Sequence, residues 1–245
     1  MKAWLNWRDC PFKFDRSDQI HIWLLPVQNS EQLLQFLTKE EIQRANKFRV
    51  QSARDQFIVA RVALRILLQR YFHLKGKSFH FKLNQYGKPY VDQSNIFFNV
   101  SHSYEWVLIG LSQAIDLGVD IEKIRLDLNL SQLAKRFFSE KEVAFLNQLP
   151  KAQKANGFFN AWTRKEAYIK ARGMGLAIPL SGFSVELRPG YEAKLIETSH
   201  DPGALKKWSL KDLPAPDGYR AAVVAQATDF TLSLWSGKNF TEILP

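Results

Sequence analysis

The sequence predicts an α+β protein made of two similar halves, related by a pseudo-two-fold axis, with a functional site at the seam between them. Two observations lead to this prediction. The order of helices and strands repeats once along the 245 residues, and a pair of carboxylates closely follows the boundary between the two repeats. Helices and strands that alternate irregularly, rather than in strict β-α-β order, favour an α+β class.

The repeat is visible at fixed spacing. A helix-starting capping box at Thr38–Glu41 returns at Ser139–Glu142, an offset of 101 residues (139 − 38). Shared order at a nearly constant offset is a signature of internal duplication. The remaining echoes pair Phe57 with Phe158, Ala60 with Ala161, Leu68 with Ile169, Phe79–Leu83 with Phe183–Leu187, and the strand at Trp106 with Tyr219–Ala225.

Local patterns of apolar residues predict each helix and strand of the first half. Alternating or continuous apolar residues predict strands, and apolar residues at helical spacing predict helices. Residues 1–115 form the predicted first half and residues 116–245 the second, with the boundary around Ser112–Asp116. In order, the first half holds a strand at 20–25, a helix from Thr38 through Phe48, a helix at 53–72, a strand at 79–83 before the turn Gly87–Pro89, and strands at 96–100 and 106–111.

Charge and composition restrict the partners. The net charge of +10 and a pI near 9.6 indicate an anionic partner, which leaves nucleic acid, a phosphate-rich small molecule or an acidic protein. Two observations argue against nucleic acid: lysine and arginine are spread along the chain rather than massed in one run, and the sequence has no zinc-ligand spacing. Cys10 is the single cysteine, so no internal disulfide forms. The opening residues lack the apolar stretch of a signal peptide, so we expect a cytoplasmic protein without a membrane partner.

The second long helix, predicted for 158–172, carries a lysine on its apolar side. Phe158, Trp162 and Ile169 fall in one arc of the helical wheel, and Lys165 falls in the same arc. Such a lysine either reaches solvent or meets an anion. Glu166 and Lys170 follow at i and i+4, where a solvated surface pair is the ordinary interpretation.

Two carboxylates share one face of the strand that begins the second half. In residues 117–122, Gly118, Asp120 and Glu122 face one way, and the glycine leaves room for a ligand. Carboxylates this close repel unless a proton or cation lies between them, and oxygen ligands alone favour Mg²⁺. Glu166 is a candidate third ligand. The alternative is a solvent-facing acidic strand edge.

A polar run ends the strand at 96–100. Asn99 and Ser101 are predicted to turn outward and His102 to stand at the strand end, where a hydroxyl, an imidazole and turn amides suit a phosphate. An ordinary polar hairpin is the alternative. The same two interpretations apply to Lys88 in its turn, and Arg44 is equally explained as a surface arginine.

Three ordered signatures resemble those of the surfactin-type 4′-phosphopantetheinyl transferases. They are Asn99–Ser103, then Gly118–Glu122, then Trp162–Lys170 closed by Gly173–Leu176, and Gly87–Pro89 fits the same pattern upstream. The resemblance spans essentially the whole chain. It implies the double-length, pseudo-symmetric form of the family, which is monomeric, rather than the half-length form that trimerises.

The resemblance implies a reaction and a role for each candidate residue. The phosphopantetheine arm of coenzyme A passes to a serine of an acidic acyl- or peptidyl-carrier protein of fatty-acid, polyketide or peptide synthesis, leaving adenosine 3′,5′-bisphosphate. By resemblance the metal is Mg²⁺, with Mn²⁺ as a substitute, and nucleic acid is not a partner. The implied roles are metal binding by Asp120, Glu122 and Glu166; catalysis by Glu166 as base and by Lys170; and contacts to coenzyme A by Arg44 at the 3′-phosphate, by Gly87, Lys88, Asn99, Ser101 and His102, and by Lys165 and Lys170.

Two other functions remain open at this point. One is a basic, Mg²⁺-dependent nucleic-acid-binding or nuclease-like protein, and the other is a degenerate coenzyme A-binding module without transfer activity. Every presumed metal ligand is present, which argues against the second.

Overall fold

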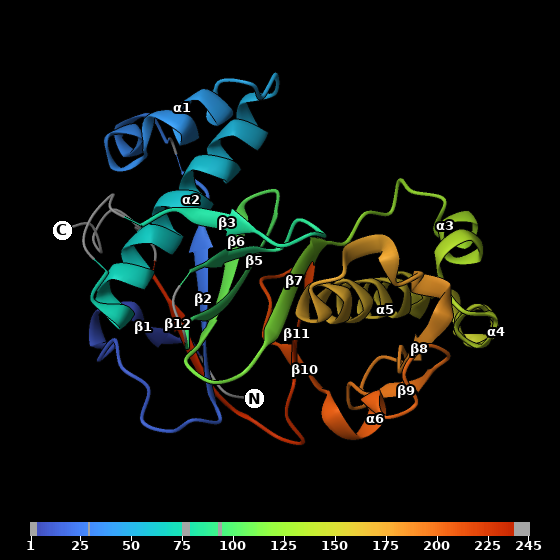
Figure 1. The fold of residues 1–245 in the computed structure, drawn as a ribbon. Coiled ribbons are helices and arrows are strands. Elements are labelled where there is room, and N and C mark those ends of the chain that lie inside the picture. Colours follow the sequence, from blue (N-terminus) through green and yellow to red (C-terminus); the bar gives the residue numbers. More distant parts are fainter. Residues whose placement is uncertain (1–3, 29, 75–78, 93–94, 238–245) are drawn as a thin grey trace.

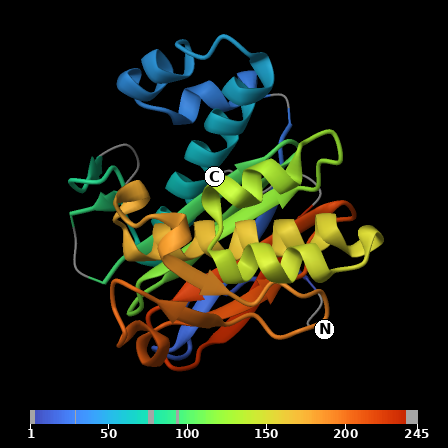
Figure 2. The same cartoon turned by 90° about the vertical axis from the view of Figure 1, so that its right-hand side faces the viewer.

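The computed structural model describes residues 4–28, 30–74, 79–92 and 95–237. Two long helices, α2 (Gln51–Phe72) and α5 (Lys151–Arg172), lie on opposite sides of the molecule with two sheets between them (Figure 1). Figure 2 shows α5 lying across the strands behind it. The described residues therefore form the predicted α+β fold, and in it each long helix covers one sheet.

The larger sheet belongs mainly to the first half. Its five strands run in the order β1-β12-β2-β6-β5, with β2 antiparallel to β6 and β6 antiparallel to β5. The strands are β1 (Leu5–Asn6), β2 (Gln19–Pro26), β5 (Phe97–Ser103), β6 (Trp106–Ser112) and β12 (Thr231–Ser236).

The smaller main sheet belongs to the second half. Its order is β10-β11-β7, antiparallel throughout. These strands are β7 (Leu117–Lys123), β10 (Ser209–Leu213) and β11 (Tyr219–Ala225). Two hairpins complete the strands: β3 (Phe81–Leu83) with β4 (Pro89–Val91), and β8 (Phe183–Val185) with β9 (Leu195–Thr198).

Shorter helices flank the two long ones. The capping boxes predicted at Thr38 and Ser139 are both formed and start helices α1 and α4. The α-helices are α1 (Lys39–Ala45), α3 (Leu130–Phe137), α4 (Glu140–Gln148) and α6 (Ala204–Lys207), and the 3₁₀ helices are Trp7–Asp9, Glu31–Phe36, Gly175–Ala177 and Leu180–Gly182. Helix α1 ends at Ala45, three residues before the predicted Phe48, and α5 begins seven residues before the predicted Phe158.

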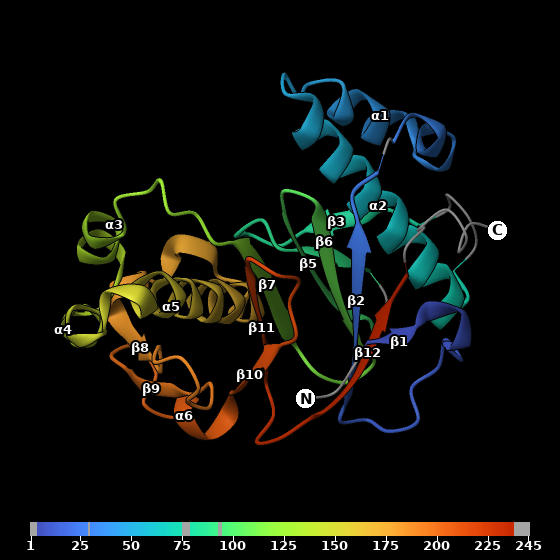
Figure 3. The ribbon, with the colours of Figure 1, turned by 180° about the vertical axis from the view of Figure 1, so that it is seen from behind.

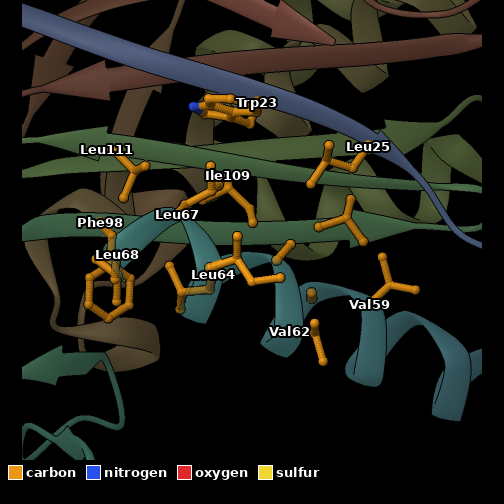
Figure 4. Close-up of a cluster of buried hydrophobic side chains, with 14 of the residues drawn as sticks. Trp23, Leu25, Val59, Val62, Leu64, Leu67, Leu68, Phe98, Ile109 and Leu111 are labelled. Atoms are coloured by element: carbon orange, nitrogen blue, oxygen red, sulfur yellow. The ribbon is translucent and has the colours of Figure 1, made fainter. Parts of the chain in front are cut away.

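Apolar burial holds the layers together in three clusters. Leu64, Leu67 and Leu68 of α2 pack against Trp23, Phe98 and Ile109 of the larger sheet (Figure 4). A second cluster lies under α5, and a third joins the inner faces of the two sheets through residues such as Ile22, Val119 and Val223. The close approach of the sheets is possible because Gly110 lacks a side chain: a Cβ there would overlap Leu117 and Val119. The two halves thus share a core.

The C-terminal strand departs from a simple division into halves. Strand β12 returns to the larger sheet and lies parallel to β1 and β2, between them (Figure 3). Its side chains alternate, so Leu234 joins the core between the sheets and Trp235 joins the core under α2. The predicted boundary at residues 115 and 116 falls in the turn between β6 and β7 and stays a prediction.

Within the described ranges, no helix is long and apolar enough to cross a membrane.

Candidate active site

Three segments meet at the seam: the end of β5, the acidic strand β7, and the C-terminal half of α5. Strand β5 is one edge of the larger sheet, and β7 is one edge of the smaller sheet. Helix α5 lies directly on β7, because a Cβ at Gly118 would overlap the Ala167 carbonyl oxygen and the Ala171 nitrogen and lie 3.0 Å from the Ala171 Cα. The space that Gly118 leaves is therefore filled by the α5 backbone, and its interpretation as room for a ligand is wrong.

Asp120 is the buried centre of this region, with 2% of its surface exposed. Its Oδ1 accepts hydrogen bonds from Lys170 Nζ at 2.5 Å and from Ser101 Oγ at 2.8 Å. Its Oδ2 is buried and has no hydrogen-bond partner among the described residues. Burial raises the pKa of the Asp120 carboxyl, and the Lys170 ammonium opposes that rise. An unpartnered carboxylate oxygen in a buried place is costly unless a proton or cation occupies it.

The charge of Asp120 acts on two further carboxylates, those of Glu122 and Glu166. Burial, followed by the Asp120 charge, raises the pKa of Glu122 to about 7. The same two causes raise the pKa of Glu166. Within the described part of the chain, however, no three acidic, histidine or cysteine side chains lie close enough together to hold a metal as they stand. Convergence of Asp120, Glu122 and Glu166 on one ion stays a prediction.

Lys170 links the acidic strand to α5. Besides Asp120, its Nζ donates to Ser101 Oγ at 3.0 Å and to the Val119 carbonyl at 3.4 Å. Its side chain is 29% exposed, so the ammonium keeps access to solvent on one side. It is the cation of the site that can exchange a protein partner for an incoming anion.

Side chains of β5 form a ladder of hydrogen bonds to the backbone of β7. Asn99 Oδ1 accepts from the Val119 N–H at 3.0 Å, and Ser101 Oγ accepts from the Ile121 N–H at 3.4 Å. Ser103 Oγ accepts from the Lys123 N–H at 3.1 Å. The three contacts advance by two residues on each strand, so polar side chains replace the backbone pairing that would otherwise join the two sheet edges.

This ladder corrects the predicted orientation of two residues. Asn99 and Ser101 are 5% and 6% exposed, and they face the seam rather than solvent. Their hydrogen bonds to the backbone of β7 explain why both polar side chains are buried, and no ligand is needed for this. The outward position expected for them belongs instead to His102, which reaches the surface beside a cavity of about 710 Å³. Partial burial and the nearby Lys170 ammonium lower the pKa of His102.

Lys88 lies at the far end of the seam from Glu122. Gly87 has φ +88°, which permits the turn before it, and Lys88 Nζ then reaches the Ala171 carbonyl at 3.0 Å and the Leu117 carbonyl at 3.3 Å. Asp116 Oδ1 is a third acceptor at 3.4 Å. Burial lowers the pKa of Lys88. The lysine thus caps the C-terminus of α5.

Arg44 occupies a separate pocket of about 300 Å³ between α1, α2 and β3. Its guanidinium lies 5.3 Å from the centre of the Phe57 ring, which Arg61 also approaches, and His80 lines the same pocket. None of the residues of this pocket belongs to the group around Asp120. Glu40 and Glu41 line the pocket too, and Glu41 pairs with Arg61 at 3.7 Å and with Arg65 at 2.9 Å, so the positive charge left for an anion is mainly that of Arg44.

Lys165 does not lie with the other candidates. It is 0% exposed, and its Nζ donates to Glu142 Oε2 at 2.6 Å and to the Phe183 carbonyl at 2.5 Å. The Phe183 ring lies 4.2 Å from the same nitrogen. Burial lowers the pKa of Lys165 to about 8, against the opposing charge of Glu142. The predicted contact of Lys165 with a phosphate is therefore wrong: its anion is Glu142, inside the core.

Ser103 and Glu142 make contacts in the structure that the sequence did not predict. Ser103 donates to Glu122, and Glu142 joins Lys165 to the capping box of α4. Ser103 continues the period of two set by Asn99 and Ser101, which is the signal that identifies it. Nothing in the spacing of Glu142 and Lys165, 23 residues apart, predicts their contact.

Comparison with known proteins gives one family. The model of the "4′-phosphopantetheinyl transferase superfamily" matches residues 116–224, and that of "4′-phosphopantetheinyl transferase, N-terminal" matches residues 23–113. The 4′-phosphopantetheinyl transferase HetI of Nostoc sp. strain PCC 7120 is 34% identical over 89% of this chain and 92% of its own. Sfp of Bacillus subtilis strain 168, another 4′-phosphopantetheinyl transferase, is 30% identical over 84% of this chain and 89% of its own.

Solved structures match less closely. A holo-(acyl-carrier-protein) synthase from Bacillus anthracis, in complex with CoA (3′,5′-ADP), matches at 20% identity and a TM-score of 0.39 over 47% of this chain and 98% of that chain. The family is assigned from the family models and the sequence relatives, not from these solved structures.

Proposed function

Because the chain belongs to the 4′-phosphopantetheinyl transferase superfamily, we propose that it transfers the 4′-phosphopantetheine arm of coenzyme A to an apo acyl- or peptidyl-carrier protein. The bond that breaks joins the arm's phosphorus to the bridging oxygen of the pyrophosphate. The bond that forms joins the same phosphorus to a serine Oγ of the carrier. The serine loses its proton, and adenosine 3′,5′-bisphosphate departs.

The buried Oδ2 of Asp120 is the observation that carries this proposal. It has no protein partner, while Oδ1 of the same carboxylate is bonded to Lys170 and Ser101. A cation bound there would satisfy the orphan oxygen and compensate for the burial of the charge.

The donor set fits a hard divalent cation. Asp120, Glu122 and Glu166 offer only oxygen, the ligand type that Mg²⁺ prefers, and Mn²⁺ is the natural substitute. When bound, Mg²⁺ would supply charge neutralisation for the pyrophosphate. Burial raises the pKa of all three carboxyl groups, and the charge of Asp120 adds to the rise at Glu122 and Glu166; a bound cation would oppose both effects.

Two residues of α5 would act in the reaction. We assign Lys170 to phosphate oxygens, since its ammonium is partly exposed and has weaker partners to give up. We assign Glu166 as the base for the carrier serine, directly or through water. Its raised pKa makes the carboxylate a stronger base than an exposed glutamate, which is the direction that general-base catalysis needs.

The first half would hold the nucleotide end of coenzyme A. His102 and Lys88 are proposed to contact its phosphates, and Gly87 shapes the turn that presents Lys88. Arg44, with Arg61 and His80 in the same pocket, is proposed for the 3′-phosphate. Asn99 and Ser101 keep a supporting role, because their side chains bond β7.

The partner and setting follow from the charge and the family. An acidic carrier domain would be attracted to a chain with a net charge of +10. We further propose a monomer acting in the cytoplasm.

The test is product analysis. The protein is incubated with coenzyme A, Mg²⁺ and a panel of apo-carriers, and both products are measured: the carrier by intact mass and the nucleotide by chromatography. We expect one carrier to gain a single arm while an equal amount of adenosine 3′,5′-bisphosphate appears. The same carrier with its serine changed to alanine is the control and should stay unmodified.

The alternatives give different results in the same assay. A degenerate coenzyme A-binding module would bind coenzyme A without forming either product. A nuclease-like protein would cleave added DNA in Mg²⁺ and leave every carrier unchanged.

A further inference from the structure

Ser103 donates the hydrogen bond that holds Glu122, one of the three metal-ligand candidates. Its hydroxyl proton goes to Glu122 Oε2 at 2.9 Å, because its lone pairs already accept the Lys123 N–H at 3.1 Å. Among the described residues, no other hydrogen bond or ion pair holds the Glu122 carboxylate. The serine is 7% exposed, so water does not compete freely for its hydroxyl.

Glu122 needs such support. Asp120 lies on the same face of β7, and Glu166 lies on the helix that packs on this strand, so like charge would push an unrestrained Glu122 toward solvent and away from them. A hydrogen bond from a buried donor opposes that motion. Outer partners of this kind orient ligands for a metal and are often as important as the ligands.

Ser103 is itself held firmly. The turn that follows it is tied to α2 by Gln56 Nε2, which donates to the Tyr104 carbonyl at 2.8 Å. The Glu105 carbonyl accepts from the Val27 N–H at 2.7 Å, after the end of β2. The Glu105 side chain is bonded by Lys123 Nζ at 3.0 Å and by the Tyr219 hydroxyl. Elements of both halves therefore fix the position of the hydroxyl.

We propose that Ser103 is a positioning residue of the transfer reaction, which orients the Glu122 carboxylate for a divalent cation. The proposal rests on the proposed function, because it needs a cation at these carboxylates. It assigns a separate purpose to each step of the ladder: Asn99 fixes the strand, Ser101 supports Asp120, and Ser103 supports Glu122.

The experiment measures metal binding and activity separately. Mn²⁺ is titrated into the full-length protein in the presence of coenzyme A and followed by electron paramagnetic resonance, for the wild type, Ser103→Ala and Ser103→Thr. We expect Ser103→Ala to bind Mn²⁺ about 10- to 100-fold more weakly. Its KM for coenzyme A at saturating Mg²⁺ should stay within about twofold of wild type, as for a residue that touches only the metal ligand. Ser103→Thr, which restores a hydroxyl, should recover most of the affinity.

A matched control separates positioning from stability. Ser112 is also buried and also accepts backbone N–H groups, from Ala114 and Ile115, but it lies at the other end of β6. Ser112→Ala should lower the melting temperature about as much as Ser103→Ala and leave Mn²⁺ affinity unchanged.

Three results would overturn the proposal, and they differ in what else they overturn. Equal Mn²⁺ affinity in wild type and Ser103→Ala, or equal weakening in Ser112→Ala, removes the positioning role and leaves the metal site intact. A wild-type protein that binds no Mn²⁺ removes both the positioning role and the metal-dependent reaction.

Discussion

Lys170 Nζ lies 2.5 Å from Asp120 Oδ1, and the second oxygen of that carboxylate, Oδ2, is buried without a partner. One side of Asp120 is thus neutralised by the protein, and the other is left for a ligand. This division of one carboxylate between a lysine and an open position is the centre of the proposed site.

The first prediction concerns the cation. Excess chelator should abolish transfer, and added Mg²⁺ should restore it, while circular dichroism shows an unchanged fold. Asp120→Asn keeps the shape but not the charge, so transfer should fall at least about a hundredfold without a lower melting temperature. Asp127→Asn, at an exposed carboxylate, is the control. Undiminished transfer in chelator would refute the three-carboxylate site.

The second prediction concerns the buried pair of Lys165 and Glu142. Lys165→Met would leave Glu142 charged and unpaired in the core, so the free energy of unfolding should fall by about 3–5 kcal/mol. Lys151→Met, at an exposed lysine of the same helix, should cost little. Urea unfolding measures both. A stable Lys165→Met protein with weakened coenzyme A binding would instead restore the phosphate role expected from sequence.

The third prediction concerns Gly118. An alanine Cβ would overlap the α5 backbone at Ala167 and Ala171, and backbone cannot move aside as a side chain can. Gly118→Ala should destabilise the protein by at least about 1–3 kcal/mol and reduce transfer, because α5 carries Glu166 and Lys170. Gly190→Ala is a control in open space, though its φ of +85° adds some strain of its own. Wild-type stability and activity in Gly118→Ala would show that the seam is not packed as described.

The fourth prediction concerns pH and His21. This imidazole is buried, its Nδ1 is bonded to the Tyr71 hydroxyl at 2.5 Å and to Trp235 Nε1 at 3.3 Å, and its Nε2 has no partner among the described residues. Burial lowers its pKa to about 4, with Asp15 opposing, against about 6.5 in the unfolded chain. Between pH 6.5 and pH 4 the unfolded state binds more protons at His21 than the folded state does. The stability that comes from burying a neutral His21 is therefore lost as pH falls through this range.

The effect of His21 is measured as the difference between wild type and His21→Phe in how the free energy of unfolding changes with pH. From pH 7 to pH 5, the free energy of unfolding of wild type should fall by about 2 kcal/mol more than that of His21→Phe, which cannot titrate. The variant corrects for the carboxyl groups, which change stability in both proteins alike. Parallel pH dependence of the two proteins would mean that His21 takes up a proton as readily in the folded state as in the unfolded chain.

Local patterns in the sequence were sufficient for much of the fold. The two capping boxes at Thr38 and Ser139 depend on contacts three residues apart, and both are formed where predicted. Helices α2 and α5 and strand β7 follow from periodicity alone. Strand β12 was not predicted, because its place beside β2 depends on a pairing over more than 200 residues of separation, such as Ser233 with His21.

The site was predictable in its residue types and less so in its contacts. Alternation placed Asp120 and Glu122 on one face, and both do face α5. Asn99 and Ser101 were expected outside, because a sequence does not reveal that a second sheet edge lies against that face. Lys165 was expected to meet a substrate anion, and only the folded structure shows that Glu142 already supplies the charge.

The most direct test of the account compares wild type with Glu166→Gln in a single mass measurement. Each protein is mixed with coenzyme A, Mg²⁺ and an apo-carrier, and the carrier's intact mass is followed over time, while calorimetry confirms that both bind coenzyme A. We expect wild type to add one phosphopantetheine arm to the carrier and Glu166→Gln to do so at least about a hundredfold more slowly. Transfer by Glu166→Gln at the wild-type rate would contradict it.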